Sequence, residues 1–95
     1  MIEKETAVAN ARMFISALRV AGGNDLVLLE DKTIERSFGW VFFYDSRKFL
    51  DTHDRLHALL GNAPLIVDRR DGSVHLTGTA RPIQFYIERY ETQYG

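Results

Sequence analysis

Histidines are the side chains best suited to chemistry in this sequence, and two of the three stand close together. The segment His53-Asp54-Arg55-Leu56-His57 has the spacing of the zinc motif H-E-x-x-H, with aspartate in place of glutamate. On a helix, this spacing places both imidazoles on one face, where they could bind a metal ion. However, Asp54 is shorter than glutamate, and no third ligand follows at a recognised spacing. We therefore predict no metal site, and a metal hydrolase built on His53 and His57 ranks last among our hypotheses.

Nucleophilic catalysis has no recognisable residues in this sequence. The chain contains no cysteine, which excludes thiolate catalysis, disulfides and Cys-ligated zinc. No serine lies in a G-x-S-x-G motif, and no glycine-rich phosphate loop precedes a helix. Asp68 and His75 form the one acid–imidazole neighbour across a predicted strand pair, which is typical of a stabilising surface pair. We predict a protein that is not an enzyme and uses no cofactor.

The composition is that of one ordinary soluble domain. With 95 residues the chain has room for one core, so we expect a single domain over residues 1–95. Thirteen acidic and twelve basic residues give a net charge of −1, which disfavours general nucleic-acid binding. The lack of cysteine, of an export signal and of a long apolar run predicts a cytoplasmic protein without a membrane partner.

Two segments have the apolar spacing of amphipathic helices. Residues 3–20 predict a first helix that ends at Ala21-Gly22-Gly23-Asn24, where glycine can close the last turn. Near the end of the chain, Arg81-Pro82 precedes a second apolar stripe and predicts a C-terminal helix. The first stripe comprises Val8, Ala11, Phe14 or Ile15, and Leu18, and the second comprises Ile83, Tyr86 or Ile87, Tyr90 and Tyr94.

The segment after the first helix predicts a pair of strands. Residues 26–29 and 33–44 are rich in aliphatic, β-branched and aromatic side chains. They should pair antiparallel across a polar turn at Glu30-Asp31-Lys32. Residues 45–60 follow with an interrupted helical spacing, so we expect helical turns there.

A second strand pair predicts which side chains share a face. Residues 64–70 and 73–77 flank Asp71-Gly72, which favours a two-residue hairpin turn that would pair Val67 with Leu76. One face of this hairpin should meet the helices, and the opposite, polar face should meet water or a partner. The first face holds Leu65, Val67, Val74 and Leu76, and the second holds Ile66, Asp68, Arg70, Ser73, His75 and Thr77.

Together these elements predict an α+β fold. We expect one antiparallel sheet of about four strands, with both terminal helices packed on one face. Residues 38–44 fit this picture poorly, because both sides of that strand are apolar. The middle segment or another chain, including a second copy in a homodimer, could cover the second side. Trp40 and Tyr44 each join a polar group to an apolar ring, which suits either a core or a binding surface.

Two blocks of the sequence resemble a known family. Phe38-Gly39-Trp40-Val41-Phe42-Phe43-Tyr44, followed by Gly61-Asn62-Ala63-Pro64-Leu65-Ile66-Val67-Asp68-Arg69 and Asp71-Gly72, resembles the immunity protein 35 family, which includes the YrhB-like small proteins. The resemblance covers most of the chain. It implies a small α+β domain that neutralises a cognate toxin in bacterial polymorphic toxin systems. For the YrhB-like members it implies a chaperone-like activity, and it implies no catalytic residue.

Our leading hypothesis is a non-enzymatic immunity protein that binds a toxin domain and blocks its active site. The candidate contacts are Trp40, Tyr44, Asp45, Asp68 and His75. The alternative is a chaperone-like protein that holds unfolded clients on apolar surface left exposed by the aromatic strand. A toxin inhibitor should have one tight partner, whereas a chaperone should suppress the aggregation of many proteins.

Overall fold

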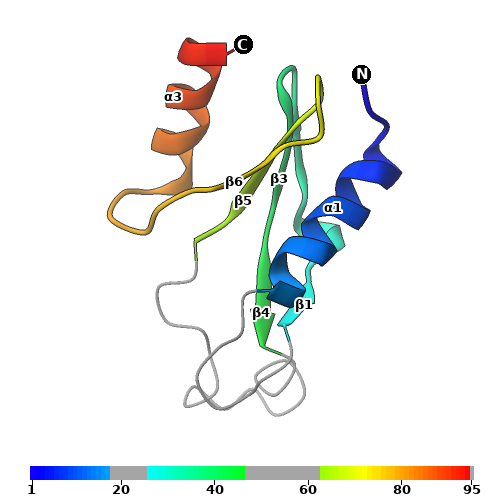
Figure 1. Cartoon of the computed structure of the whole chain (residues 1–95). Coiled ribbons are helices and arrows are strands. Elements are labelled where there is room, and N and C mark those ends of the chain that lie inside the picture. Colours follow the sequence, from blue (N-terminus) through cyan, green and yellow to red (C-terminus); the bar gives the residue numbers. More distant parts are fainter. Residues whose placement is uncertain (18–25, 47–62, 95) are drawn as a thin grey trace.

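An antiparallel sheet lies between two helices in the computed structural model, which describes residues 1–17, 26–46 and 63–94 (Figure 1). The main sheet has four strands in the order β2-β3-β5-β6, and a second ladder joins β1 to β4. This arrangement confirms the predicted α+β fold with helices near both ends. The elements are α1 (Lys4–Ala17), β1 (Leu26–Leu28), the 3-10 helix η1 (Glu30–Lys32), β2 (Ile34–Arg36), β3 (Gly39–Phe42), β4 (Tyr44–Ser46), β5 (Leu65–Asp68), β6 (Val74–Leu76) and α3 (Ile83–Tyr94). Within the described ranges, no helix is long and apolar enough to cross a membrane.

The first hairpin differs from the predicted one. β1 does pair antiparallel with β4, but residues 33–44 are not a single strand. Instead, β2 and β3 fold back on each other, with Arg36 opposite Gly39 and a tight turn at residues 37–38. Residues Glu30–Lys32, predicted as the turn, form a 3-10 helix that interrupts one arm of this longer hairpin.

The glycine at the start of β3 explains why the chain turns there. Gly39 has φ of 148°, a conformation that side chains other than glycine rarely adopt. A Cβ atom at this position would overlap the carbonyl oxygen of Val67 and lie 2.9 Å from the backbone nitrogen of Arg69. Glycine therefore permits both the turn and the close approach of β3 to β5.

The hairpin of β5 and β6 is confirmed, but its register is shifted by two residues. Val67 lies opposite Val74, where the prediction placed Leu76. The loop contains four residues and not two, because Asp68 donates its backbone N–H to the carbonyl of Ser73 at 2.9 Å. Since a shift of two preserves the alternation of side chains, each face keeps its predicted residues.

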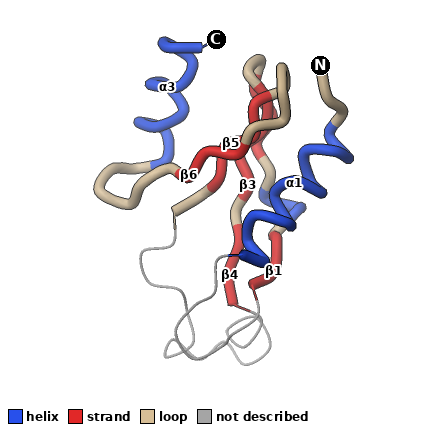
Figure 2. Tube along the Cα trace, in the orientation of Figure 1, coloured by secondary structure: helices blue, strands red, loops and turns tan. Residues whose placement is uncertain are grey.

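The two helices cover opposite faces of the sheet, so the prediction that both pack on one face is wrong (Figures 1 and 2). The apolar residues on both sides of β3 explain this result, since each side requires its own cover. On the α1 side, the buried cluster comprises Ala7, Ala11, Ile15, Leu28, Trp40, Phe42, Tyr44, Leu65 and Val67. On the α3 side, it comprises Phe38, Val41, Ile66, Ile87 and Tyr90.

The helical stripes read from the sequence are confirmed where the structure describes them. In α1, Ala7, Ala11 and Ile15 are buried, with Val8 and Phe14 packed beside the core. In α3, Ile87 and Tyr90 are buried, and the ring of Tyr90 lies 4.8 Å from that of Phe38 between centroids. The predicted helical turns at 45–60 lie largely outside the described residues, as do His53 and His57.

Candidate functional site

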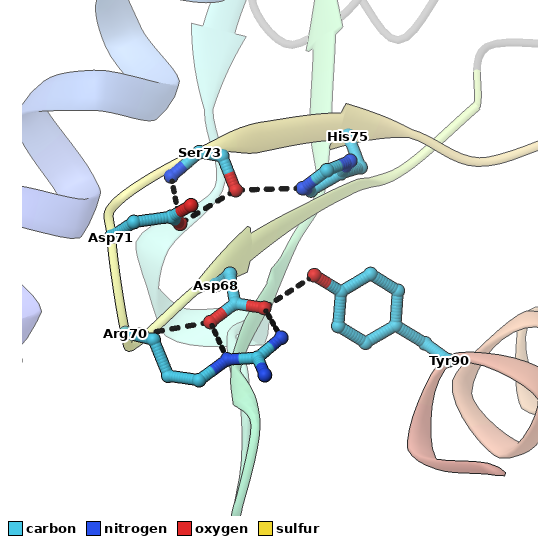
Figure 3. Close-up of polar contacts among 6 residues, drawn as sticks. All are labelled: Asp68, Arg70, Asp71, Ser73, His75 and Tyr90. Carbon is cyan, nitrogen blue, oxygen red and sulfur yellow. Dashed lines mark hydrogen bonds and ion pairs between the residues drawn. The ribbon is translucent and has the colours of Figure 1, made fainter. Parts of the chain in front are cut away.

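A buried carboxylate links the sheet to the last helix. Asp68, at the end of β5, is 2% exposed and lies on the α3 side of the sheet. It accepts hydrogen bonds from the Tyr90 hydroxyl at 2.6 Å and from the Nη2, Nε and backbone N–H of Arg70 at 2.8, 3.1 and 2.8 Å (Figure 3). These bonds satisfy a charge that would otherwise be costly to bury.

This network fixes the protonation state of both buried groups. The hydrogen bonds from Arg70, and secondarily that from Tyr90, hold the pKa of Asp68 well below its ordinary value, although burial alone would raise it. Burial and the bond to the carboxylate raise the pKa of the Tyr90 hydroxyl well above its ordinary value. At neutral pH the carboxylate therefore stays ionised and the phenol stays protonated, so neither group is suited to exchange a proton in a reaction.

A serine and a histidine also stand close together on the second hairpin. Ser73 Oγ lies 2.7 Å from His75 Nε2 and 2.7 Å from a carboxylate oxygen of Asp71 (Figure 3). The hydrogen bonds from Ser73 lower the pKa of Asp71, so its ionised carboxylate accepts the one hydroxyl proton. His75 Nε2 must then donate to Ser73 Oγ, whereas a general base would have to accept from it. This arrangement stabilises the hairpin and is oriented against nucleophilic catalysis.

Metal binding finds no support in the parts of the chain that the structure describes. No group of three or more His, Asp or Glu side chains is arranged there to hold a metal ion. His75, the one histidine within those parts, has the Ser73 hydroxyl and the ring of Tyr90 as its neighbours.

An open cleft runs between β6 and α3. Its volume is about 130 Å³, and we call it the β6–α3 groove. Strand β6 supplies the exposed His75 and Leu76, and α3 supplies Tyr86, Arg89 and Gln93. The groove therefore combines hydrogen-bonding and cationic side chains at the surface, next to the buried Asp68–Tyr90 pair.

The five residues predicted to contact a partner do not form one surface. Trp40, Tyr44 and Asp68 are only 3%, 5% and 2% exposed, so the expectation that Asp68 faces water is wrong. Asp45 is half-buried and His75 is exposed, and they belong to different strand pairs. Thus the side chains of three of the five candidates lie inside the molecule.

The aromatic strand forms part of the core. Trp40 packs on the α1 side, and the guanidinium of Arg69 lies 4.7 Å from the centre of its ring. Burial also raises the pKa of the Tyr44 hydroxyl on that side. Since α1 and α3 cover the two faces of β3, the apolar surface on which the chaperone-like alternative depended is not exposed.

Sequence reasoning missed the groove residues on α3. Tyr86, Arg89 and Gln93 are spaced three and four residues apart, which places them on one face of a helix. This spacing was visible in the sequence. However, only the folded structure shows that this helical face lies beside β6, because the sequence did not indicate which face of the sheet α3 would cover.

Comparison with known proteins identifies the family. The immunity protein 35 family matches residues 5–93, which includes every described strand and nearly all of both helices. The chain belongs to the immunity protein 35 family. This result confirms the resemblance drawn from the aromatic strand and the second hairpin, and it places the β6–α3 groove within the family's domain.

One curated relative of this immunity protein 35 member is an uncharacterized protein, YrhB, of Escherichia coli strain K12. The two chains are 46% identical over 55 residues. The matched stretch spans 58% of this chain and 58% of YrhB. No solved structure was found to match the chain.

Proposed function

We propose that the chain neutralises a cognate toxin of a polymorphic toxin system by binding the toxin domain directly. The observation that carries this proposal is the family match over residues 5–93. Because that match spans both helices and both strand ladders, the whole folded domain would act as the inhibitor.

The chemistry of the described side chains supports binding over catalysis. Asp68 is buried and held by hydrogen bonds from Arg70 and Tyr90. The hydroxyl of Ser73 is directed to Asp71 and so is not activated by the imidazole beside it. These polar groups hold the hairpin and α3 in place and leave other side chains to make contacts.

Two of the predicted contacts remain suitable for a partner-binding surface. His75 is exposed on β6, and Asp45 is partly exposed on β4, so we propose that both contact the toxin. Trp40, Tyr44 and Asp68 would support these two separate regions from within, by packing against α1 or by fixing α3. In this proposal the buried residues determine shape, and the exposed ones determine which toxin is recognised.

Co-expression with the toxin encoded by the neighbouring gene tests this proposal. We expect the full chain to protect cells and to co-purify with the toxin domain as a discrete complex. The matched control is an unrelated, aggregation-prone protein, which the chain should not keep soluble. Protection without a complex, or a complex with the control as well, would contradict neutralisation by specific binding.

A further inference from the structure

We infer that the outer edge of β6, which no described strand pairs, receives an extended, acidic segment of the partner as an added strand, with its carboxylates next to Arg89 in the β6–α3 groove. This inference rests on the proposed function, because the toxin would supply the segment. It adds the site and the chemistry of the contact, namely backbone hydrogen bonds along β6 and an ion pair to α3.

The register shows which backbone groups β6 offers. Thr77 donates to the carbonyl of Pro64 at 3.0 Å, and Asp68 donates to that of Ser73 at 2.9 Å. In an antiparallel ladder such pairs alternate with pairs whose N–H and C=O groups point away from the partner strand. The groups of Val74 and Leu76 therefore point to the outer edge, where no described strand pairs with β6.

The side chains beside this edge carry an uncompensated positive charge. An added strand would direct every second side chain toward the α3 side, into the groove where His75 and Arg89 lie. Arg89 is exposed and has no ion-pair partner among residues 1–17, 26–46 and 63–94. In contrast, four described arginines pair with carboxylates: Arg12, Arg36, Arg69 and Arg70. A glutamate or aspartate on the added strand would complement Arg89.

The opposite edge of the sheet is less suited to accept a strand. Strand β2 carries charged side chains that are already engaged, since Glu35 pairs with Arg69 at 3.0 Å and Arg36 with Glu91 at 3.2 Å. Engaged charges on an edge strand are a common protection against further pairing. Strand β6 instead exposes Leu76, which is 51% accessible to solvent.

A second copy of the chain fits the β6 edge poorly. A two-fold axis perpendicular to the sheet would keep both α3 helices on the same face and bring them together at the seam. The grooves of both copies would then lie beside the seam, and the lining of each holds Arg89 and no carboxylate. A second copy would therefore bring no negative charge to Arg89 in the groove, and the structure favours an acidic partner over self-association.

Peptide titrations monitored by NMR test this inference directly. The probes are an eight-residue peptide of alternating glutamate and valine and a matched peptide with lysine in place of glutamate. We expect the glutamate peptide alone to shift the amide signals of Val74 and Leu76 and to slow their hydrogen exchange. Arg89→Glu should weaken its binding at least about tenfold and favour the lysine peptide. Arg81→Glu is the matched control, since Arg81 packs over Phe85 outside the groove and should leave binding unchanged.

A second pair of variants tests the backbone contacts. Leu76→Pro removes an N–H that points to the outer edge, so the ladder between β5 and β6 should persist. We expect this variant to keep the native amide spectrum yet to bind the glutamate peptide at least about tenfold more weakly. Leu76→Val keeps the N–H and should bind like the original chain. If Leu76→Pro does not fold, the Arg89→Glu result alone decides.

The outcomes separate this inference from the proposed function. The inference is overturned if the glutamate peptide fails to bind at millimolar concentration or if the lysine peptide binds equally well. It is also overturned if the amide signals that shift lie elsewhere on the surface, or if the chain self-associates through β6. If folded Arg89→Glu and Leu76→Pro variants still neutralise the toxin fully, the inference fails and the proposed function stands. If the peptide binds at β6 but the original chain neutralises no toxin, the proposed function fails.

Discussion

The buried carboxylate of Asp68 shows how much of a residue's surroundings could be predicted from the sequence. The alternation of the second hairpin correctly placed Asp68 on the face opposite Leu65 and Val67. The sequence did not show that α3 crosses to that same face, so Asp68 was expected in water and is instead bonded to Tyr90. The signal for a second covered face was the apolar character of both sides of β3, which was recognised, but the cover was assigned to the middle segment or another chain and not to α3.

Removing one hydroxyl measures what this contact contributes. Tyr90→Phe deletes the hydrogen bond to Asp68 and leaves the ring in place. A hydrogen bond to a charged group contributes about 1.5–3 kcal/mol, and Arg70 still compensates the carboxylate, so we expect a loss near the lower end of that range. Urea unfolding at pH 7 measures it. Tyr86→Phe is the matched control on the same helix and should change stability by less than about 0.5 kcal/mol. Equal effects of the two variants would contradict the role given to Tyr90.

The same carboxylate predicts how stability depends on pH. The folded state lowers the pKa of Asp68 below its ordinary value of 3.8. Its contribution to the free energy of unfolding is therefore full above that value and is lost as the pH falls through 3.8 toward the folded pKa. We expect the stability advantage of the original chain over Asp68→Asn to be large at pH 7 and smaller at pH 3, measured by urea unfolding. An advantage that is the same at both pH values would show that the charge of Asp68 does not stabilise the fold.

Among the elements, helices were easier to predict than turns. The apolar stripes of α1 and α3 repeat along the whole length of each helix, so each helix prediction is supported by many side chains. The turn at residues 37–38 is marked only by Ser37 and Gly39, and the strand-forming residues on both sides of it concealed it. The loop after β5 was found through Asp71-Gly72, but its length was underestimated because Arg69 and Arg70 also belong to it. The register between β5 and β6 therefore depends on the length of this loop, and turn propensity in the sequence did not determine that length.

Two glycine substitutions test this account of the turns. Gly39→Ala should destabilise the chain by about 3 kcal/mol or more, because its Cβ atom would overlap the backbone of β5 at an already strained φ. Gly72→Ala should cost only about 1–2 kcal/mol, since its φ of 76° is also unfavourable but its Cβ atom meets the movable end of the Asn10 side chain. Urea unfolding, or the soluble yield of each variant, makes the comparison. A Gly39→Ala variant as stable as Gly72→Ala would show that β3 does not need this close approach.

The whole molecule is a sheet covered on both faces, and this bears on its function. The sequence predicted the α+β class and the family, because both rest on features spread along the chain. It could not predict the placement of the helices, which depends on how distant segments meet. The aromatic strand is buried between α1 and α3, so the described residues leave strand edges and the β6–α3 groove, and not this strand, accessible to a partner.

Inhibition by binding has a stoichiometry that catalysis lacks. A fixed amount of purified toxin domain, titrated with the intact chain, should lose activity linearly and reach full inhibition at about one equivalent. Inhibition should be complete once the complex has formed and should not increase further with time. Full inhibition by a small fraction of an equivalent, increasing with time, would mean that the chain chemically inactivates the toxin and would contradict the central claim of this account.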